Sequence, residues 1–494
     1  MRQTTKLNAR ALSSLDGTVP VPAYDRSQVR SGIVHLGVGG FHRAHQAMYL
    51  DALLNRGEAL DWGITGVGLL PGDAGINEVL TAQDGLYTLV EKDSDGSRRA
   101  RVIGSLQRHL LAPQDPEAVL ARLTDPETKI VSLTITEGGY PLDDVTGEFD
   151  PDRPGVREDA RGDEAPRTAT GYLVEALARR RAAGVPPFTV MSCDNIPGNG
   201  DAAARSVAGL ARLRDDELAG WIEQHVAFPN SMVDRITPAT TDADRAAVTE
   251  QFGVEDGWPV VCEPFAQWVL EDRFTAGRPA LEDAGVHLVD DVVPYELMKL
   301  RLLNAGHQAL CYLAHLAGYQ YADEATRDEV FGAFVHAYMT REGIPTLPQV
   351  PGVDLHEYAG TLVERFANPE IRDTLARLCT DTSDRIPKFL LPVVRTQLAE
   401  GGEVHRAALV VAAWARYAEG VDEQGRPFEI NDRRRDQVAA NAKRQQDEPL
   451  AFIRDRSLFG DLAEDSRFSA AYLEALESLR ERGARETARL WLQK

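Results

Sequence analysis

The fold of this chain is decided by Gly32-Ile33-Val34-His35-Leu36-Gly37-Val38-Gly39-Gly40-Phe41-His42-Arg43. The first half is a short β-rich run, and the glycines stand where this strand would turn into a helix predicted over 43–54. Such a turn can hold a pyrophosphate on backbone N–H groups, because glycines lack the Cβ that would block its approach. His42 replaces the third glycine of the usual G-x-G-x-x-G pattern, so an ordinary strand-to-helix turn is the alternative. The candidate cofactor-binding residues here are Gly37, Val38, Gly39, Gly40 and Phe41.

Further β-rich runs alternate with helical stretches up to about residue 200. Strands are predicted at 62–69, 87–91, 129–136 and 188–193. This alternation predicts an α/β fold with a Rossmann-type, mostly parallel sheet covered on both faces. Residues 146–168 are rich in proline and charge, which predicts a long exposed loop outside the core.

The pattern changes near residue 290, where helical periodicity takes over. Helices are predicted at 294–318, 327–341, 355–366, 403–419 and 468–492. A chain of 494 residues exceeds what one core usually supports. We therefore expect two domains, a dinucleotide-binding Rossmann-type domain over 1–288 and a mainly helical catalytic and substrate domain over 289–494.

The composition excludes several classes of protein. The net charge of -22 would repel a nucleic acid backbone and an anionic membrane surface. The longest apolar run, 407–415, is too short to span a bilayer, and the first residues carry no signal-like apolar stretch, so a cytoplasmic protein is expected. The four cysteines are scattered singly, which predicts reduced core residues and no metal site.

The most informative segment for chemistry runs from Tyr295 to His307. In an α-helix, Glu296, Lys299, Asn304 and His307 would share an arc of about 140°. Burying such a face is costly unless the polar groups have partners or a ligand. Oxidation of an alcohol needs a base and neutral donors around the oxygen, roles that suit Lys299 and Asn304. Glu296 could relay the proton and His307 could hold a neighbouring hydroxyl.

Alternatives exist for the same residues. Lys299 and Glu296 could form a solvated pair, and His307 could be a satisfied core histidine. The spacing Tyr295-x-x-x-Lys299 formally matches the pair of short-chain dehydrogenases. In that family the pair lies inside the nucleotide-binding domain, whereas here it opens the helical half, so we discount the match.

Polar residues also follow the predicted strands, where side chains of a doubly wound sheet face the ligand. Asn195 could be a second oxygen donor, whereas an Asx-turn is the expected role of Asn199 and equally of Asp194. Glu137, between Thr and Gly residues, is placed to contact cofactor or gate the cleft. Asp73 is the nearest acid after the second strand for a ribose hydroxyl.

Three further residues are candidates for the substrate site. Asp234 and its neighbour Arg235 stand between two prolines, which suggests a rigid wall or a structural ion pair. Arg377 and Arg385 lie in the helical half and could reach hydroxyls of the substrate, with exposed surface residues as the alternative.

Together these segments resemble the polyol-specific long-chain dehydrogenase/reductase, or mannitol dehydrogenase, family. The similarity runs nearly end to end, through Gly37–His45, Thr136–Tyr140, Ser192–Pro197, Val233–Pro238, Val261–Phe265, Lys299 and His307. The resemblance implies Lys299 as catalytic base, Asn195 and Asn304 as the pair holding the oxygen, His307 in substrate binding and Glu296 in proton relay. It also implies that Asp234, Arg377 and Arg385 line the substrate site, that Asp73 helps select NAD over NADP, and that no metal is used.

Arg385 departs from the resemblance, because members acting on mannitol carry lysine there. A guanidinium can bind a carboxylate through two hydrogen bonds, whereas the ammonium group of a lysine offers only a point charge. This keeps a uronate substrate open as an alternative.

The expected function is NAD-dependent interconversion of D-mannitol and D-fructose, with NADP possible. Fructuronate reduction and D-arabinitol oxidation are the alternatives within the family. A non-catalytic nucleotide or sugar sensor would have lost the base or the donors, yet Lys299, Asn195, Asn304 and His307 are all present. A metal-dependent alcohol dehydrogenase would need ligand spacing that the sequence lacks. The expected partner is a small polyol or ketose, and the sequence is compatible with a monomer.

Overall fold

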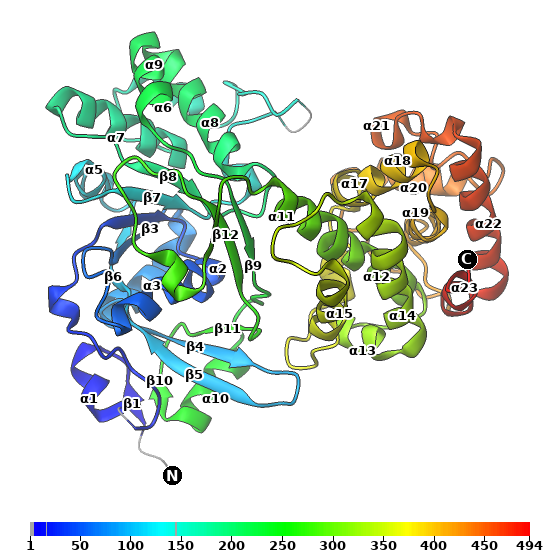
Figure 1. Ribbon diagram of the computed structural model, residues 1–494, viewed down its shortest axis with the longest axis horizontal. Coiled ribbons are helices and arrows are strands. Elements are labelled where there is room, and N and C mark those ends of the chain that lie inside the picture. Colours follow the sequence, from blue (N-terminus) through cyan, green and yellow to red (C-terminus); the bar gives the residue numbers. More distant parts are fainter. Residues whose placement is uncertain (1–3, 16, 144–145) are drawn as a thin grey trace. The chain divides into compact units, whose positions relative to one another are not determined.

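The computed structural model describes residues 4–15, 17–143 and 146–494. The chain divides into two compact units, with the division between Val292 and Val293 (Figure 1). In the described residues no helix has the length and apolar character needed to cross a membrane. All four cysteines are buried and free.

The first unit is built on a sheet of five parallel strands in the order β6-β3-β2-β7-β8. The strands are β2 (Ile33–Leu36), β3 (Ile64–Gly68), β6 (Leu106–Leu111), β7 (Ile130–Leu133) and β8 (Thr189–Ser192). The chain runs outward from β2 through β3 to β6 and then returns to β7 and β8 on the other side. The order reverses between β2 and β7, and ligands of such sheets bind at the carboxyl ends of the strands beside that point. The predicted Rossmann-type fold is therefore confirmed.

Hydrophobic cores cover both faces of this sheet. Val34 and Leu36 belong to one core with Leu173 of α7 (Ala169–Ala183). Ile33 belongs to the other core with Leu50 of α3 (Gln46–Asn55). The alternation along β2 follows from successive side chains of a strand pointing to opposite faces.

The other strands of this unit form smaller sheets. The strand predicted at 87–91 is β4 (Tyr87–Lys92), which pairs with β5 (Arg98–Ile103) and β11 (Val260–Cys262) and does not join the parallel sheet. A second group joins β9 (Ser231–Asp234), β12 (Gln267–Glu271) and β13 (His287–Val289). The remaining pair is β1 (Thr5–Lys6) with β10 (Val254–Glu255).

Two local predictions for this unit were wrong. The helix predicted over 43–54 is divided into α2 (Gly40–Ala44) and α3, because His45 between them has φ -125° and ψ -95°. The loop predicted over 146–168 contains α6 (Val156–Arg161), whose Val156 is buried in the core. Glycines in the left-handed region stand at both ends of α6, and its buried Asp159 accepts backbone N–H groups, so this charged segment is satisfied locally. The other α-helices here are α1 (Leu12–Leu15), α4 (Ala74–Ala82), α5 (Pro116–Thr124), α8 (Asn199–Arg214), α9 (Asp216–His225) and α10 (Asp242–Phe252).

The second unit is mainly helical, as predicted. The helix predicted at 355–366 is α15 (Leu355–Phe366). The helix predicted at 468–492 is divided into α22 (Ser466–Arg482) and α23 (Ala484–Trp491) by Gly483, whose φ is +79°. The other α-helices of this unit are α11 (Val293–Met298), α12 (Ala305–Leu316), α13 (Ala322–Arg327), α14 (Glu329–Tyr338), α16 (Leu375–Leu378), α17 (Thr382–Arg385), α18 (Leu391–Glu400), α19 (His405–Tyr417), α20 (Arg435–Arg444) and α21 (Arg456–Phe459).

Helices of the wider π type are a distinctive feature of this unit. Its described residues include three π-helical segments, η6 (Lys299–Asn304), η7 (Met339–Gly343) and η9 (Ile386–Leu390). Segment η6 contacts both η7 and η9. Such segments are rare and occur frequently at functional sites.

Candidate active site

The glycine turn follows β2 and leaves room for a ligand. Gly37 has φ +94°, and a Cβ there would collide with the carbonyl oxygen of Thr134. At Gly39 an added Cβ would meet no described atom within 4 Å, so the backbone is open to close approach. Gly40 then begins α2, and the ring of Phe41 stacks on His45 at 4.9 Å. This open backbone fits the pyrophosphate of a dinucleotide, for which the turn was predicted.

A pair of buried histidines lies beneath this turn. His42, at the position of the third glycine, stacks on His35 with the ring centroids 3.5 Å apart. The Nδ1 atom of His35 lies 2.8 Å from Ser132 Oγ, and its Nε2 atom lies 2.8 Å from Thr134 Oγ1. Burial lowers the pKa of His35 to about 3 and lowers that of His42 well below its ordinary value. Both rings are therefore neutral at neutral pH.

The neighbouring strand β3 brings an acid to the same edge. Asp73 accepts the backbone N–H of Leu70 at 2.9 Å. A Cβ on Gly68, the last residue of β3, would lie 3.3 Å from Oδ2 of Asp73. The carboxylate thus stands over the end of the strand next to β2, where a ribose hydroxyl is expected in this fold.

On the other side of the turn, β7 leads into a strained loop. Thr136 has φ +62° and ψ 169°, a region used almost only by glycine and worth on the order of 1–3 kcal/mol of strain. The carboxylate of Asp194, after β8, accepts the N–H groups of Ile135 and Thr136 at 3.1 and 2.7 Å and the Tyr140 hydroxyl at 2.6 Å. Burial raises the pKa of Asp194, and these hydrogen bonds oppose that shift. Glu137, directly after Thr136, is exposed.

The loop after β8 places Asn195 at the surface, one residue beyond the buried Asp194. Asn199 does not make the predicted turn but joins two segments, because its Nδ2 donates to the carbonyl oxygens of Asp194 and Ser231 at 3.0 and 2.8 Å. The structure therefore brings the glycine turn, Asp73, Glu137 and Asn195 to one edge of the parallel sheet.

Asp234 ends β9, is buried, and lies opposite Gln267 in the sheet. Its neighbour Arg235 has a fully buried side chain that pairs with Glu91 at 2.7 Å and donates to the carbonyl oxygen of Ala44 at 2.8 Å. Arg235 thus anchors the end of α2, a role that sequence reasoning missed. Nothing in the sequence could identify Glu91 as the partner, because it precedes Arg235 by 144 residues.

In the second unit, the lysine segment is not the α-helix that we predicted. Lys299 is only 6% exposed and begins η6, and Asn304 ends it. In an α-helix, residues five and eight positions after Lys299 would lie about 140° and about 80° away from its face. The i→i+5 hydrogen bond of a π-helix accommodates one residue more than the i→i+4 bond of an α-helix. Residues five and eight positions after Lys299 therefore lie where residues four and seven positions after it would lie in an α-helix. Asn304 and His307 therefore follow Lys299 on nearly the same face, after about one and two turns.

His307, in α12, lies among aromatic and charged groups of the same unit. Its ring stacks on Phe366 with centroids 4.0 Å apart. Burial lowers its pKa to about 3, the charge of Asp373 opposes this shift, and nearby arginines that include Arg377 and Arg385 add to it. The imidazole is therefore neutral at neutral pH and can donate or accept a single hydrogen bond at each nitrogen.

The two arginines predicted for the substrate site are held by different partners. Arg377 forms a two-bond ion pair with Asp373, with Nε 2.6 Å from Oδ1. Arg385, the last residue of α17, donates to the carbonyl oxygen of Leu378 at 2.9 Å. The structure brings Glu296, Lys299, Asn304 and His307 onto one continuous helical stretch. It also places Arg377 and Arg385 near enough to His307 for their charges to lower its pKa.

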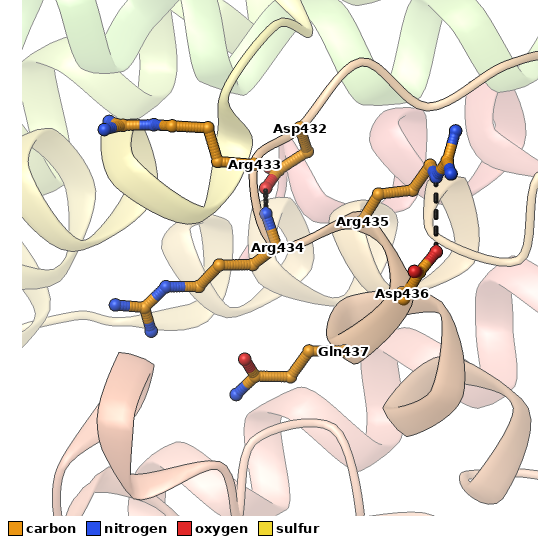
Figure 2. Close-up of a pocket in the computed structure, with 6 residues that line it drawn as sticks. All are labelled: Asp432, Arg433, Arg434, Arg435, Asp436 and Gln437. Carbon is orange, nitrogen blue, oxygen red and sulfur yellow. Dashed lines mark hydrogen bonds and ion pairs between the residues drawn. The ribbon is translucent and has the colours of Figure 1, made fainter.

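A cavity of about 360 Å³ lies elsewhere in this unit, lined by residues 432–437 (Figure 2). No predicted site residue is among those lining it. Two of its three arginines face carboxylates, since Arg435 lies 3.3 Å from Asp436 and Arg433 lies 3.7 Å from Asp384. Asp432 accepts hydrogen bonds from the N–H group and the hydroxyl of Ser383 at 2.7 and 2.6 Å. Residues 432–437 therefore stabilise α17, the helix that ends at Arg385.

The described residues contain no cluster of three or more histidine, cysteine or acidic side chains arranged to hold a metal ion.

Comparisons with known proteins agree with this architecture. The model of the mannitol dehydrogenase Rossmann domain matches residues 31–283, and that of the mannitol dehydrogenase C-terminal domain matches residues 291–480. The chain is 47% identical to a mannitol 2-dehydrogenase of Phaeosphaeria nodorum over 98% of this chain and 85% of the relative. It is 45% identical to a mannitol 2-dehydrogenase of Aspergillus fumigatus over 98% of both chains.

Two solved structures cover almost the whole chain. One is the Pseudomonas fluorescens mannitol 2-dehydrogenase in a ternary complex with NAD and D-mannitol, with 47% identity, a TM-score of 0.89 and coverage of 99% of this chain and 100% of that one. The other is a substrate-free D-sorbitol dehydrogenase, with 39% identity, a TM-score of 0.90 and coverage of 98% and 100%. These matches confirm the resemblance seen in the sequence. This chain belongs to the mannitol dehydrogenase family.

Proposed function

We propose that this chain is an NAD-dependent dehydrogenase that interconverts D-mannitol and D-fructose. The observation that carries the proposal is its match over almost its whole length to a mannitol 2-dehydrogenase whose complex holds NAD and D-mannitol. The buried Lys299 at the start of a π-helical segment is consistent with that chemistry.

The cofactor would be held by the first unit. Gly37 to Phe41 would accept the pyrophosphate, since the backbone at Gly39 is open. Asp73 would bind the ribose hydroxyls, which favours NAD because a 2′-phosphate there would meet a carboxylate. Glu137, exposed in the loop that follows β7, would contact the cofactor beside the reversal in strand order. When bound, NAD⁺ supplies the acceptor for the hydride that leaves the alcohol carbon.

Lys299 would act as the base. Its side chain is desolvated, and desolvation disfavours the ammonium form, which cannot accept a proton. The neutral amine Nζ would take the hydroxyl proton as the carbon–oxygen bond becomes a carbonyl. Glu296, buried and one turn earlier in α11, would pass that proton toward water.

Two amides would hold the reacting oxygen. Asn195 and Asn304 carry uncharged N–H donors, which stabilise negative charge on oxygen without competing for the proton. The neutral ring of His307 would hold a neighbouring hydroxyl of the open-chain substrate. Asp234, Arg377 and Arg385 would contact the remaining hydroxyls, and their positions would set which polyol is preferred.

The test is turnover by the purified protein, followed through NADH absorbance. D-mannitol, D-sorbitol and D-arabinitol would be compared in oxidation, and D-fructose and fructuronate in reduction, each also with the NADP forms. Sorbitol is included because a D-sorbitol dehydrogenase shares the fold at 39% identity. Activity with mannitol and fructose that survives a chelator is expected. Binding of NADH without any turnover would favour the sensor alternative.

A Lys299→Ala variant tests the base. General base catalysis contributes typically about 10²–10⁴-fold, so we expect kcat to fall by that range while NADH still binds. Lys443→Ala, an exposed lysine of α20, is the matched control and should keep wild-type rates. Wild-type turnover by Lys299→Ala would refute the mechanism.

A further inference from the structure

We propose that Asp194 is a positioning residue of this site, which holds Thr136 in a conformation otherwise reserved for glycine. The inference rests on the proposed function, because the loops that Asp194 joins carry two residues to which that function gives a role. These are Glu137, proposed to contact the cofactor, and Asn195, proposed to hold the reacting oxygen.

The carboxylate of Asp194 accepts three hydrogen bonds from the loop that follows β7. Its Oδ1 atom accepts the Thr136 N–H at 2.7 Å, and its Oδ2 atom accepts the Ile135 N–H at 3.1 Å. The hydroxyl of Tyr140 adds a third donor, 2.6 Å from Oδ2. Only 6% of Asp194 is exposed, so these bonds do not compete with bulk water. One side chain after β8 thus fastens the loop that follows β7.

The fastened loop contains the strained residue. Thr136 combines φ +62° with ψ 169°, where the Cβ of any residue except glycine is crowded. Such a conformation persists only when its surroundings over-determine it, and such residues cluster at active sites and ligand clamps. The two N–H bonds to Asp194 fix the peptide on the amino side of Thr136 and of the residue before it. These two hydrogen bonds supply the constraint that keeps Thr136 in its strained conformation.

The hydrogen bonds from the N–H groups of Ile135 and Thr136 to Asp194, which we call the clamp, join two loops that carry residues of the proposed site. Thr136 directly precedes Glu137, and Asp194 directly precedes Asn195. Both loops leave the carboxyl ends of β7 and β8, which are neighbouring parallel strands with Leu133 opposite Ser192. If the clamp opened, Thr136 would relax to negative φ and redirect the chain at Glu137. A single carboxylate therefore sets the geometry of both loops.

The chain offers a matched carboxylate away from this edge. Asp159 accepts the N–H groups of Arg167 and Thr168 at 2.8 and 3.0 Å and the Thr168 hydroxyl at 2.6 Å. Asp159 is also buried. The loop that it holds joins α6 to α7 and carries no proposed site residue. The change Asp159→Asn removes the same kind of acceptor without touching the proposed site.

The experiment compares wild type with Asp194→Asn, Thr136→Gly, the double variant and Asp159→Asn. Thermal unfolding, the Kd of NADH by fluorescence, and kcat and KM for mannitol and NAD would be measured for each. We expect Asp194→Asn to weaken NADH binding and to lower kcat/KM for mannitol about tenfold, equivalent to about 1.4 kcal/mol. Asp159→Asn should lower the melting temperature and leave the kinetic constants unchanged.

The double variant is the decisive arm. Glycine adopts φ +62° without a steric penalty, so Thr136→Gly in the Asp194→Asn background should recover most of the lost affinity and turnover. A double variant no better than Asp194→Asn would overturn the proposal, as would wild-type constants for Asp194→Asn. If Asp194→Asn does not fold, a folded double variant that binds NADH supports the clamp and an unfolded one refutes it. A wild-type protein without NADH binding or polyol turnover would refute the proposed function, and unfolding of the same variants would still test the clamp.

Discussion

His42 and His35 form a parallel ring stack, with centroids 3.5 Å apart and an angle of 11° between the planes. In the usual dinucleotide-binding turn, the third glycine allows the helix to pack closely on the strand. Here a ring from α2 lies on a ring from β2, and both side chains are almost completely buried. The space between helix and strand is thus filled by aromatic surface, which explains how the turn forms without that glycine.

Replacing His42 by the glycine of the usual pattern should therefore destabilise the protein. We expect His42→Gly to lower the free energy of unfolding by about 2–5 kcal/mol, as large-to-small changes in a core do. His42→Phe keeps a ring in the stack and removes two buried nitrogens that have no hydrogen-bond partner in the described structure, so it should be tolerated. Urea unfolding of both variants checks this, and equal stability of the two would contradict it.

Buried histidines should make stability depend on pH. Burial lowers the pKa of His35 and His307 to about 3 and that of His109 to about 4, below the ordinary value of 6.5. The folded state therefore binds fewer protons than the unfolded state between those values, and stability falls as pH falls below about 6.5. Each such group contributes a slope of up to about 1.4 kcal/mol per pH unit in that window.

The measurement is urea unfolding at a series of pH values between about 7 and about 5. His109→Asn should flatten the curve by about one proton. A His109→Asn variant whose slope equals that of the wild type would contradict neutral burial of the His109 ring.

The ion pair of the fully buried Arg235 with the partly exposed Glu91 should be worth more than a surface pair. Removing one partner of a buried ion pair costs about 3–5 kcal/mol, and because the Glu91 that remains keeps some contact with water, we expect Arg235→Met to lose an amount at the lower end of that range. Arg273 pairs with Glu271 at 3.3 Å but its side chain is 59% exposed, and Arg273→Met should change stability by less than about 1 kcal/mol. Denaturant unfolding distinguishes the two, and similar losses would contradict the anchoring role of Arg235.

Arg385 should decide how well a carboxylate-bearing substrate is accepted. A hydrogen bond to a charged group is worth about 1.5–3 kcal/mol, so Arg385→Lys should lower kcat/KM for fructuronate by at least about tenfold. The loss with fructose should be smaller, because fructose carries no carboxylate. Parallel kinetics with both ketoses test this, and an equal loss would show that Arg385 does not recognise the carboxylate.

Much of the architecture could be predicted from local sequence. The central strand β2 and the helix α15 follow directly from apolar periodicity. The family resemblance added the residues proposed for the site, which periodicity could not have named. Polar and charged character misled at α6, because its acid Asp159 is satisfied by the backbone of the next loop, which a composition argument cannot anticipate.

Other features depend on contacts that no local pattern contains. The π-helical form of η6 leaves the apolar pattern almost unchanged, so Lys299 and Asn304 were expected in an α-helix. The strand β4 has the composition of a buried strand, yet its partners β5 and β11 place it in a separate sheet. Long-range pairing decides such cases, and sequence periodicity carries no information on it.

The contact of η6 with η7 and η9 concentrates irregular backbone in one region of the helical unit. Each of these segments gives up the regular i→i+4 ladder, so the local free energy of opening should be lowest where they meet. Amide hydrogen exchange would then begin there, before the regular helices α15 and α19 lose protection. The region that carries the proposed base would therefore open before these two helices, and bound substrate would slow its exchange.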